Sequence, residues 1–308
     1  MEAAVVLLRW AQFGAGFVLA GGALFALYAL PAVGRSSAQA LGWPRRLLAG
    51  SAAMLLLASL AGLVLQTAVV AGSLAAALDP TTLASVLTEM AMGLSSVTRA
   101  AAAAIALAIL LLMPCRRAPL AIVAHLGAIA VASMAWMGHG AASDGAGGLP
   151  HLAADIIHLL AAAVWIGALA FFLGLAGTAW RDGAAASDLH AALAGFSGLG
   201  TGLVAALVVT GLVNSWFLVG PAGAAALFTT LYGQLLLLKI ALFTGMILLA
   251  AVNRFRLTPA LRQALGDPAS NDAEVKALRQ SLILELGAGL AVLALVAWLG
   301  RLAPITAQ

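Results

Sequence analysis

Long apolar runs recur along the whole chain, separated by shorter segments that hold proline, glycine or charged residues. A helix that crosses a membrane needs about 20 mainly apolar residues, and proline, glycine and charge clusters mark where such helices end. We therefore expect an all-α fold, a polytopic membrane helix bundle. The runs predict eight spans, at about 5–30, 47–74, 94–113, 119–138, 151–177, 192–219, 233–252 and 281–300.

Two of the connecting segments carry signals of their own. Asp79 and Pro80 form a typical helix start, because an aspartate side chain caps free backbone amides and proline suits the first helical position. The pair predicts a short interfacial helix at 80–93, before the third span. The segment 253–280 is expected to be the only long polar connection between spans.

The composition excludes a soluble domain. Charged residues make up 8% of the chain, whereas a soluble domain carries about 25%. Short loops rich in Arg and Lys stay in the cytoplasm, so the distribution of basic residues places both termini on the outer side. The net charge of +4 comes from clusters in alternate connections, so we expect the lipid bilayer as a partner and no nucleic acid. The basic connections are 31–46, 114–118, 178–190 and 253–280.

Polar side chains within the spans are the candidates for function. An ionisable side chain inside a span costs roughly 2.5–3.5 kcal/mol on insertion scales, so such residues are rare unless they have a role. Six ionisable residues fall in this class, Arg99, His125, Asp155, His158, Lys239 and Glu285, and Gln66 and Asn214 are uncharged polar members.

The hairpin of the fourth and fifth spans gathers six candidate metal ligands at its outer mouth: Met134, Met137, His139, His151, Asp155 and His158. His151, Asp155 and His158 share one face of the fifth span, because they are spaced i, i+4 and i+7. At ~1.5 Å rise per residue, His158 lies roughly 10 Å deeper than His151. We therefore expect two stations in line, with His139 and His151 at the rim and Asp155 and His158 below.

These ligand types favour copper. Imidazole and thioether groups together suit a copper ion, and thioether favours the cuprous state, so the cargo is expected to be Cu(I) or Cu(II). In the alternative interpretation, the two methionines fill the hairpin core, and His139 and His151 are solvated loop residues.

The other polar residues allow two interpretations each. His125, Asn214, Lys239 and Glu285 are candidates for a translocation path. For His125 we favour a neutral ring bonded to a neighbouring backbone group. For Glu285 we favour pairing with the basic segment 253–280, rather than a role as an exit acid.

Two further cations have predicted acidic partners. Lys239 lies at a depth like that of Asp155, so an ion pair would satisfy both charges. Arg99 faces the same outer half of the membrane, and is expected to neutralise Glu89 or Asp155.

The sequence resembles the copper resistance protein D (CopD) family of bacterial inner-membrane proteins, from about residue 120 to 305. The first three spans resemble that family only in plan, through Arg9 and Arg99. We accordingly divide the single membrane domain into a three-span part, 1–118, and a CopD-like five-span part, 119–308. The motifs that carry the resemblance are Gly138-His139, the segment Asp155-Ile-Ile-His158-Leu-Leu-Ala-Ala-Ala-Val-Trp165-Ile-Gly167, Tyr232-Gly233, Lys239, Asn253-Arg254 and Glu285.

The resemblance implies a multi-pass inner-membrane protein that moves copper, usually inward from the periplasm. It also implies a periplasmic copper carrier of the CopC type as a partner. By residue match, His139 and His158 inherit the strongest claim to copper, and Asp155 comes next.

Transport without an energy source of its own is the leading hypothesis, because the chain has no Walker-type phosphate loop; an enzyme is not expected. One alternative is a copper sensor or delivery partner that does not translocate the ion. Another is a membrane redox protein with haem held between His125 and His158, because haem takes paired axial ligands from facing helices.

Overall fold

The computed structural model describes residues 2–29, 42–114, 116–138, 147–180 and 185–307. Within these ranges the chain is helical and contains no strand. Eight of the described helices are long and apolar enough to cross a membrane, as the sequence predicts. His139 lies outside the described residues.

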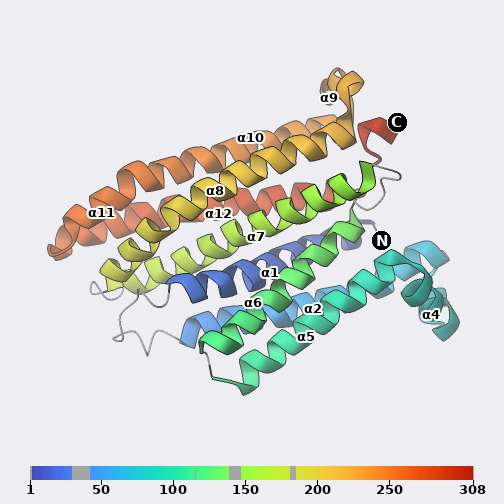
Figure 1. Ribbon diagram of the computed structural model, residues 1–308, viewed down its shortest axis with the longest axis horizontal. Coiled ribbons are helices and arrows are strands. Elements are labelled where there is room, and N and C mark those ends of the chain that lie inside the picture. The colour runs from blue at the N-terminus through green and yellow to red at the C-terminus, as the bar shows by residue number, and fades with distance from the viewer. Residues whose placement is uncertain (1, 30–41, 115, 139–146, 181–184, 308) are drawn as a thin grey trace.

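Successive spans run antiparallel, so that both termini lie at one end of the bundle (Figure 1). We call this the terminal end. The opposite end, where α2 and α6 begin and α11 lies, is the basic end. The spans are α1 (Glu2–Ala29), α2 (Gly42–Ala71), α5 (Ala91–Leu112), α6 (Arg117–Ala132) with a 3₁₀ extension η2 (Ser133–Met137), α7 (Gly148–Ala179), α8 (Ala186–Val219), α10 (Leu231–Val252) and α12 (Pro268–Leu299). Shorter helices are α3 (Leu74–Ala77), α4 (Pro80–Glu89), η6 (Pro221–Ala224), α9 (Ala226–Thr229), the π-helical η7 (Asn253–Leu257), α11 (Thr258–Ala264) and η8 (Ile305–Ala307).

The start of α4 agrees with the sequence prediction. Asp79 is its N-cap and accepts a hydrogen bond from the Thr82 backbone amide, with Pro80 in the first turn. Hydrogen bonds from the Thr81 hydroxyl, and then from Thr82, hold the pKa of Asp79 below its ordinary value. Asp79 thus fixes where the short helix begins.

The prediction for the segment 253–280 was wrong. Its residues form η7, α11 and the first turns of α12, so the seventh span continues as helix to Ala264 and the eighth begins at Pro268. Apolar residues such as Leu261 and Leu278 are buried on the inner face of these extensions, while the basic residues point outward. An amphipathic helix therefore carries the charge that the sequence analysis assigned to a loop.

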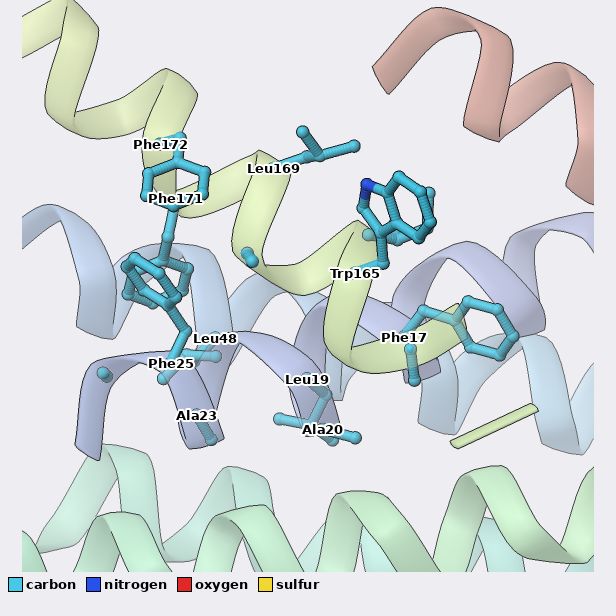
Figure 2. Packing of buried hydrophobic residues seen from close by; sticks show 14 of the residues in the cluster. Phe17, Leu19, Ala20, Ala23, Phe25, Leu48, Trp165, Leu169, Phe171 and Phe172 are labelled. Atoms are coloured by element: carbon cyan, nitrogen blue, oxygen red, sulfur yellow. The ribbon is translucent and has the colours of Figure 1, made fainter. Parts of the chain in front are cut away.

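Helix α1 forms the centre of the bundle and packs against α2, α6, α7 and α12. Its apolar side chains meet those of α7, where Phe25 lies 4.8 Å from Phe172 between ring centroids (Figure 2). The two helices approach closely at Gly21 and Gly167, because a Cβ at either position would overlap the backbone of the other helix. Small residues permit this kind of packing in membranes.

The bundle has two halves joined along α1. Helices α1, α2, α5 and α6 pack together on one side, and α7, α8, α10 and α12 form the other. Figure 1 shows α8, α10 and α12 on one flank of α7, and α2, α5 and α6 beyond α1. Because α8 packs on α7 while α10 packs on α12, the second half encloses the cavities that make up the candidate site.

Candidate functional site

Three cavities follow α7 from the terminal end towards the basic end. The terminal chamber has a volume of about 160 Å³, the middle chamber about 250 Å³ and the basic chamber about 490 Å³. His158 and Lys239 line both the terminal and the middle chambers. Trp165 lines both the middle and the basic chambers. The polar residues of the terminal chamber include Arg9, His151, Asp155, His158, Asn214, Tyr232 and Lys239, beside the thioether of Met134.

The hydrogen bonds of His158 define the state of its ring. Its Nδ1 atom lies 2.9 Å from the hydroxyl oxygen of Thr210 on α8. That hydroxyl donates its own proton to the carbonyl of Ala206, at 2.6 Å, so Nδ1–H of His158 is the donor to it. The neutral ring therefore carries its free lone pair on Nε2, which is how a histidine is prepared to bind a metal ion.

Asp155 lies one turn above His158 on α7, and its Oδ1 accepts a hydrogen bond from Nδ2 of Asn214 at 3.4 Å. The amide oxygen of Asn214 is buried and has no partner among the described residues. A Cβ on Gly138 would lie 3.8 Å from Oδ2 of Asp155. Gly138, the residue before His139 in the sequence, therefore lies close to the Asp155 carboxylate.

His151 is not a solvated loop residue, as the alternative interpretation of the sequence had it. Its side chain is 1% exposed and stacks on the ring of Phe217 of α8, with 4.6 Å between centroids and 9° between planes. The aromatic stack is available because α7 and α8 pack along their length. His151 is therefore part of the wall of the terminal chamber.

The two methionines of the hairpin, Met134 and Met137, make different contacts. Met134 is buried and lines the terminal chamber. Met137 contributes its backbone carbonyl, which accepts a hydrogen bond from Nη2 of Arg9 at 3.0 Å, and it is not among the residues that line the chamber. Arg9 also donates to the carbonyl of Gly300, so it ties α1 to η2 and to the end of α12.

The predicted acidic partners of the two buried cations are borne out only in part. Asp155 and Lys239 line the same chamber and attract each other electrostatically, but among the described residues they form no direct ion pair. Nη1 of Arg99 donates to Oε1 of Gln12 at 2.7 Å, rather than pairing with an acid. The sequence analysis did not predict Gln12 as that partner, because a neutral amide 87 residues away gives no charge signal.

His125 lies on the exposed surface of α6, away from the three chambers. Its Nδ1 is 2.7 Å from the carbonyl of Ala121, one turn earlier in the same helix. This is the backbone-bonded arrangement that the sequence analysis favoured. His125 therefore lines none of the three chambers.

Glu285 lines the basic chamber with partners other than the predicted basic ones. Its Oε1 accepts a hydrogen bond from Nε1 of Trp165, and its Oε2 accepts one from Nδ2 of Asn253, each at 2.8 Å. Asn253 belongs to the segment 253–280 but is neutral. The sequence analysis did not assign Trp165 or Asn253 to the site, although both stand in the motifs that it quoted.

Within the part of the chain that the structure describes, no three His, Cys, Asp or Glu side chains form a group that could hold a metal ion. The terminal chamber is instead lined by the imidazole of His158 and the carboxylate of Asp155, both on α7, and by the thioether of Met134 on η2. Imidazole and thioether groups are ligand types that soft cations accept.

The fold defines a polytopic helical membrane protein with three interior chambers along α7, of which the terminal chamber has the most polar lining. Residues 190–299 match the family model described as Copper resistance protein D, and residues 1–149 match that of the Copper resistance protein D-like, N-terminal domain. The chain is 38% identical to Copper resistance protein D of Pseudomonas syringae pv. tomato, over 97% of this chain and 96% of that protein. The chain belongs to the copper resistance protein D family and is a multi-pass inner-membrane protein.

Two other relatives match part of the chain. Inner membrane protein YebZ of Escherichia coli (strain K12) is 33% identical over 42% of this chain and 43% of its own length. Copper transport protein CutJ of Bacillus subtilis (strain 168) is 33% identical over 35% of this chain and 19% of its own length. No solved structure matches the chain.

Proposed function

We propose that the protein carries copper ions across the inner membrane, inward from the periplasm to the cytoplasm. The observation that carries this proposal is His158, whose Nδ1 is held by Thr210 and whose ring lines two adjoining chambers. A ligand that faces both chambers can accept an ion from one and release it to the other.

The terminal end is the entrance in this proposal, because basic clusters favour the cytoplasm for the opposite end. Copper first meets His139 and His151, and then Asp155 and the thioether of Met134. These nitrogen, oxygen and sulfur ligands accommodate both copper oxidation states, with sulfur favouring Cu(I). A periplasmic copper carrier of the CopC type would deliver the ion at this mouth.

Beyond His158 the ion passes into the middle chamber and reaches Trp165, which separates it from the basic chamber. Asn214 and Lys239 line the upper part of this route, and Glu285 lines the last chamber. The continuation of cavities past His158 favours transport over a sensor or a delivery partner, which needs only the terminal chamber. A haem held by His125 and His158 is not supported, because His125 lies on the outer surface of α6.

The test is copper accumulation in cells that express each variant to the same membrane level. His158→Ala should abolish the accumulation that depends on the protein, because the ring nitrogen between the chambers is removed. His125→Ala is the matched control, since it removes an exposed imidazole from the same bundle, and it should leave accumulation unchanged. Equal accumulation by His158→Ala and the unaltered protein would remove His158 from the route.

A further inference from the structure

The carboxyl group of Glu285 is buried in an unusual way. Its side chain is 2% exposed, and each oxygen accepts one hydrogen bond from a neutral donor, Trp165 or Asn253. A buried charge is expensive unless it is paired as well as hydrogen-bonded. The arrangement therefore suits a carboxyl group that gains and loses a proton.

The basic side chains near the basic chamber have other partners. Arg254 of η7 lines this chamber with Glu285, but its Nη1 donates to the carbonyl of Ser197 and the hydroxyl of Thr201 on α8. The remaining basic side chains of this end on η7, α11 and α12 are exposed: Arg256, Arg262, Lys276 and Arg279.

The charged groups on the other helices packed against α12 lie further along the bundle. His158 on α7 and Lys239 on α10 lie in the middle chamber, on the far side of Trp165. Arg9 on α1 is bonded at the terminal end. Among the residues that the structure describes, no basic side chain forms an ion pair with Glu285.

Asn253 has an unused acceptor beside the carboxyl group. Its Oδ1 is buried and has no hydrogen-bond partner among the described residues, while its Nδ2 donates to Glu285. A primary amide carries a donor and an acceptor on one carbon, so a half-turn of the group exchanges them. Asn253 is the first residue of the π-helical turn η7, and Thr258 donates to its backbone carbonyl at 2.8 Å. Such turns recur at functional sites.

We infer that Glu285 is a proton-binding site in the wall of the basic chamber, beside Trp165. Uptake forms an O–H bond on Oε2 and breaks one O–H bond of a hydronium ion at the basic end, which leaves as water; no bond in the protein is broken. The amide of Asn253 turns so that Oδ1 accepts this new O–H group. Trp165 continues to donate to Oε1, which becomes the carbonyl oxygen.

The consequence for transport rests on the proposed function. Ionised Glu285 offers a negative charge to a cation that passes Trp165, and protonated Glu285 offers none. Proton binding would then release copper towards the basic end and make the rate of copper entry depend on cytoplasmic pH. The proton site itself requires no copper.

The test is infrared difference spectroscopy of the purified, copper-free full chain in lipid, recorded between alkaline and acid pH. We expect a carbonyl stretching band from a protonated buried carboxyl group at the acid end. Glu285→Gln should remove the Glu285 component of this band and leave any component from Asp155, because glutamine keeps the shape and the acceptor for Trp165 without the titrating group. Glu274→Gln makes the same change earlier in α12 and should retain the band.

A second variant tests the assignment without removing the acid. Trp165→Phe deletes the indole donor, so the band should persist and move to a higher stretching frequency. Absence of a titrating band in the unaltered protein, or a band unchanged by both Glu285→Gln and Trp165→Phe, overturns the inference. Because these spectra need no copper, failure of the transport proposal in the His158→Ala assay would be seen separately.

Discussion

Replacing Thr210 with valine tests whether the hydrogen bond at Nδ1 prepares His158 to bind a metal ion. The substitution exchanges one hydroxyl group for a methyl group. Valine has the same branched shape as threonine, so the packing of α8 against α7 should be kept. The hydroxyl that accepts Nδ1–H of His158 at 2.9 Å is lost. The backbone carbonyl of Ala206 loses a hydroxyl donor, but keeps its place in the helix.

The expected loss of copper affinity follows from the role of a hydrogen bond to the non-binding nitrogen of a histidine ligand. Without an acceptor at Nδ1, the tautomer with the proton on Nε2 becomes accessible, and this proton competes with the metal ion. Loss of the partner of a metal-binding histidine typically costs 10–100-fold in affinity, or about 1.4–2.7 kcal/mol. We expect Thr210→Val to weaken Cu(I) binding by about this factor.

The assay is competition for Cu(I) between the purified protein in lipid nanodiscs and a chromogenic chelator. Thr244→Val is the matched control, because Thr244 makes the same bond to its own helix, to the Ile240 carbonyl at 3.0 Å, on an exposed face of α10. The control should keep the affinity of the unaltered protein. If both variants bind Cu(I) equally well, Thr210 does not prepare the ring of His158 for copper.

Two further predictions concern the thioether and the core. Met134→Leu keeps the buried volume but removes the sulfur, so Cu(I) affinity should fall while the thermal midpoint stays nearly unchanged; the exposed Met54→Leu should alter neither. Gly167→Ala places a methyl group into the α1 backbone and should lower stability by about 1–3 kcal/mol, whereas Gly177→Ala has open space around it. Thermal unfolding followed by tryptophan fluorescence separates the two glycines, and equal midpoints would contradict the close contact of α1 and α7.

The spans could be predicted because membrane insertion depends on local composition. Each of the eight runs is long and apolar enough by itself, and the structure contains a helix at each. The bounds were less predictable, because helices continue beyond the bilayer wherever they have an apolar face to bury. The eighth span begins at Pro268, and not near 281, since Val275 and Leu278 are buried.

The candidate site could be predicted where its members share one helix. His151, Asp155 and His158 follow from helical spacing, and the structure places all three along one cavity. Partners from distant helices could not be found in this way. Thr210 lies 52 residues from His158, and a threonine within an apolar run has no distinguishing sequence pattern.

Charge was the least reliable guide to pairing inside the bundle. Pairing each buried ion with an opposite charge predicted acids for Arg99 and Lys239, and bases for Glu285. The structure instead gives Arg99 and Glu285 neutral partners. An amide or indole donor stabilises a carboxylate without cancelling its charge, so the group stays able to bind a proton or to attract a cation. A salt bridge would remove that ability, which is why neutral partners are consistent with a route for ions.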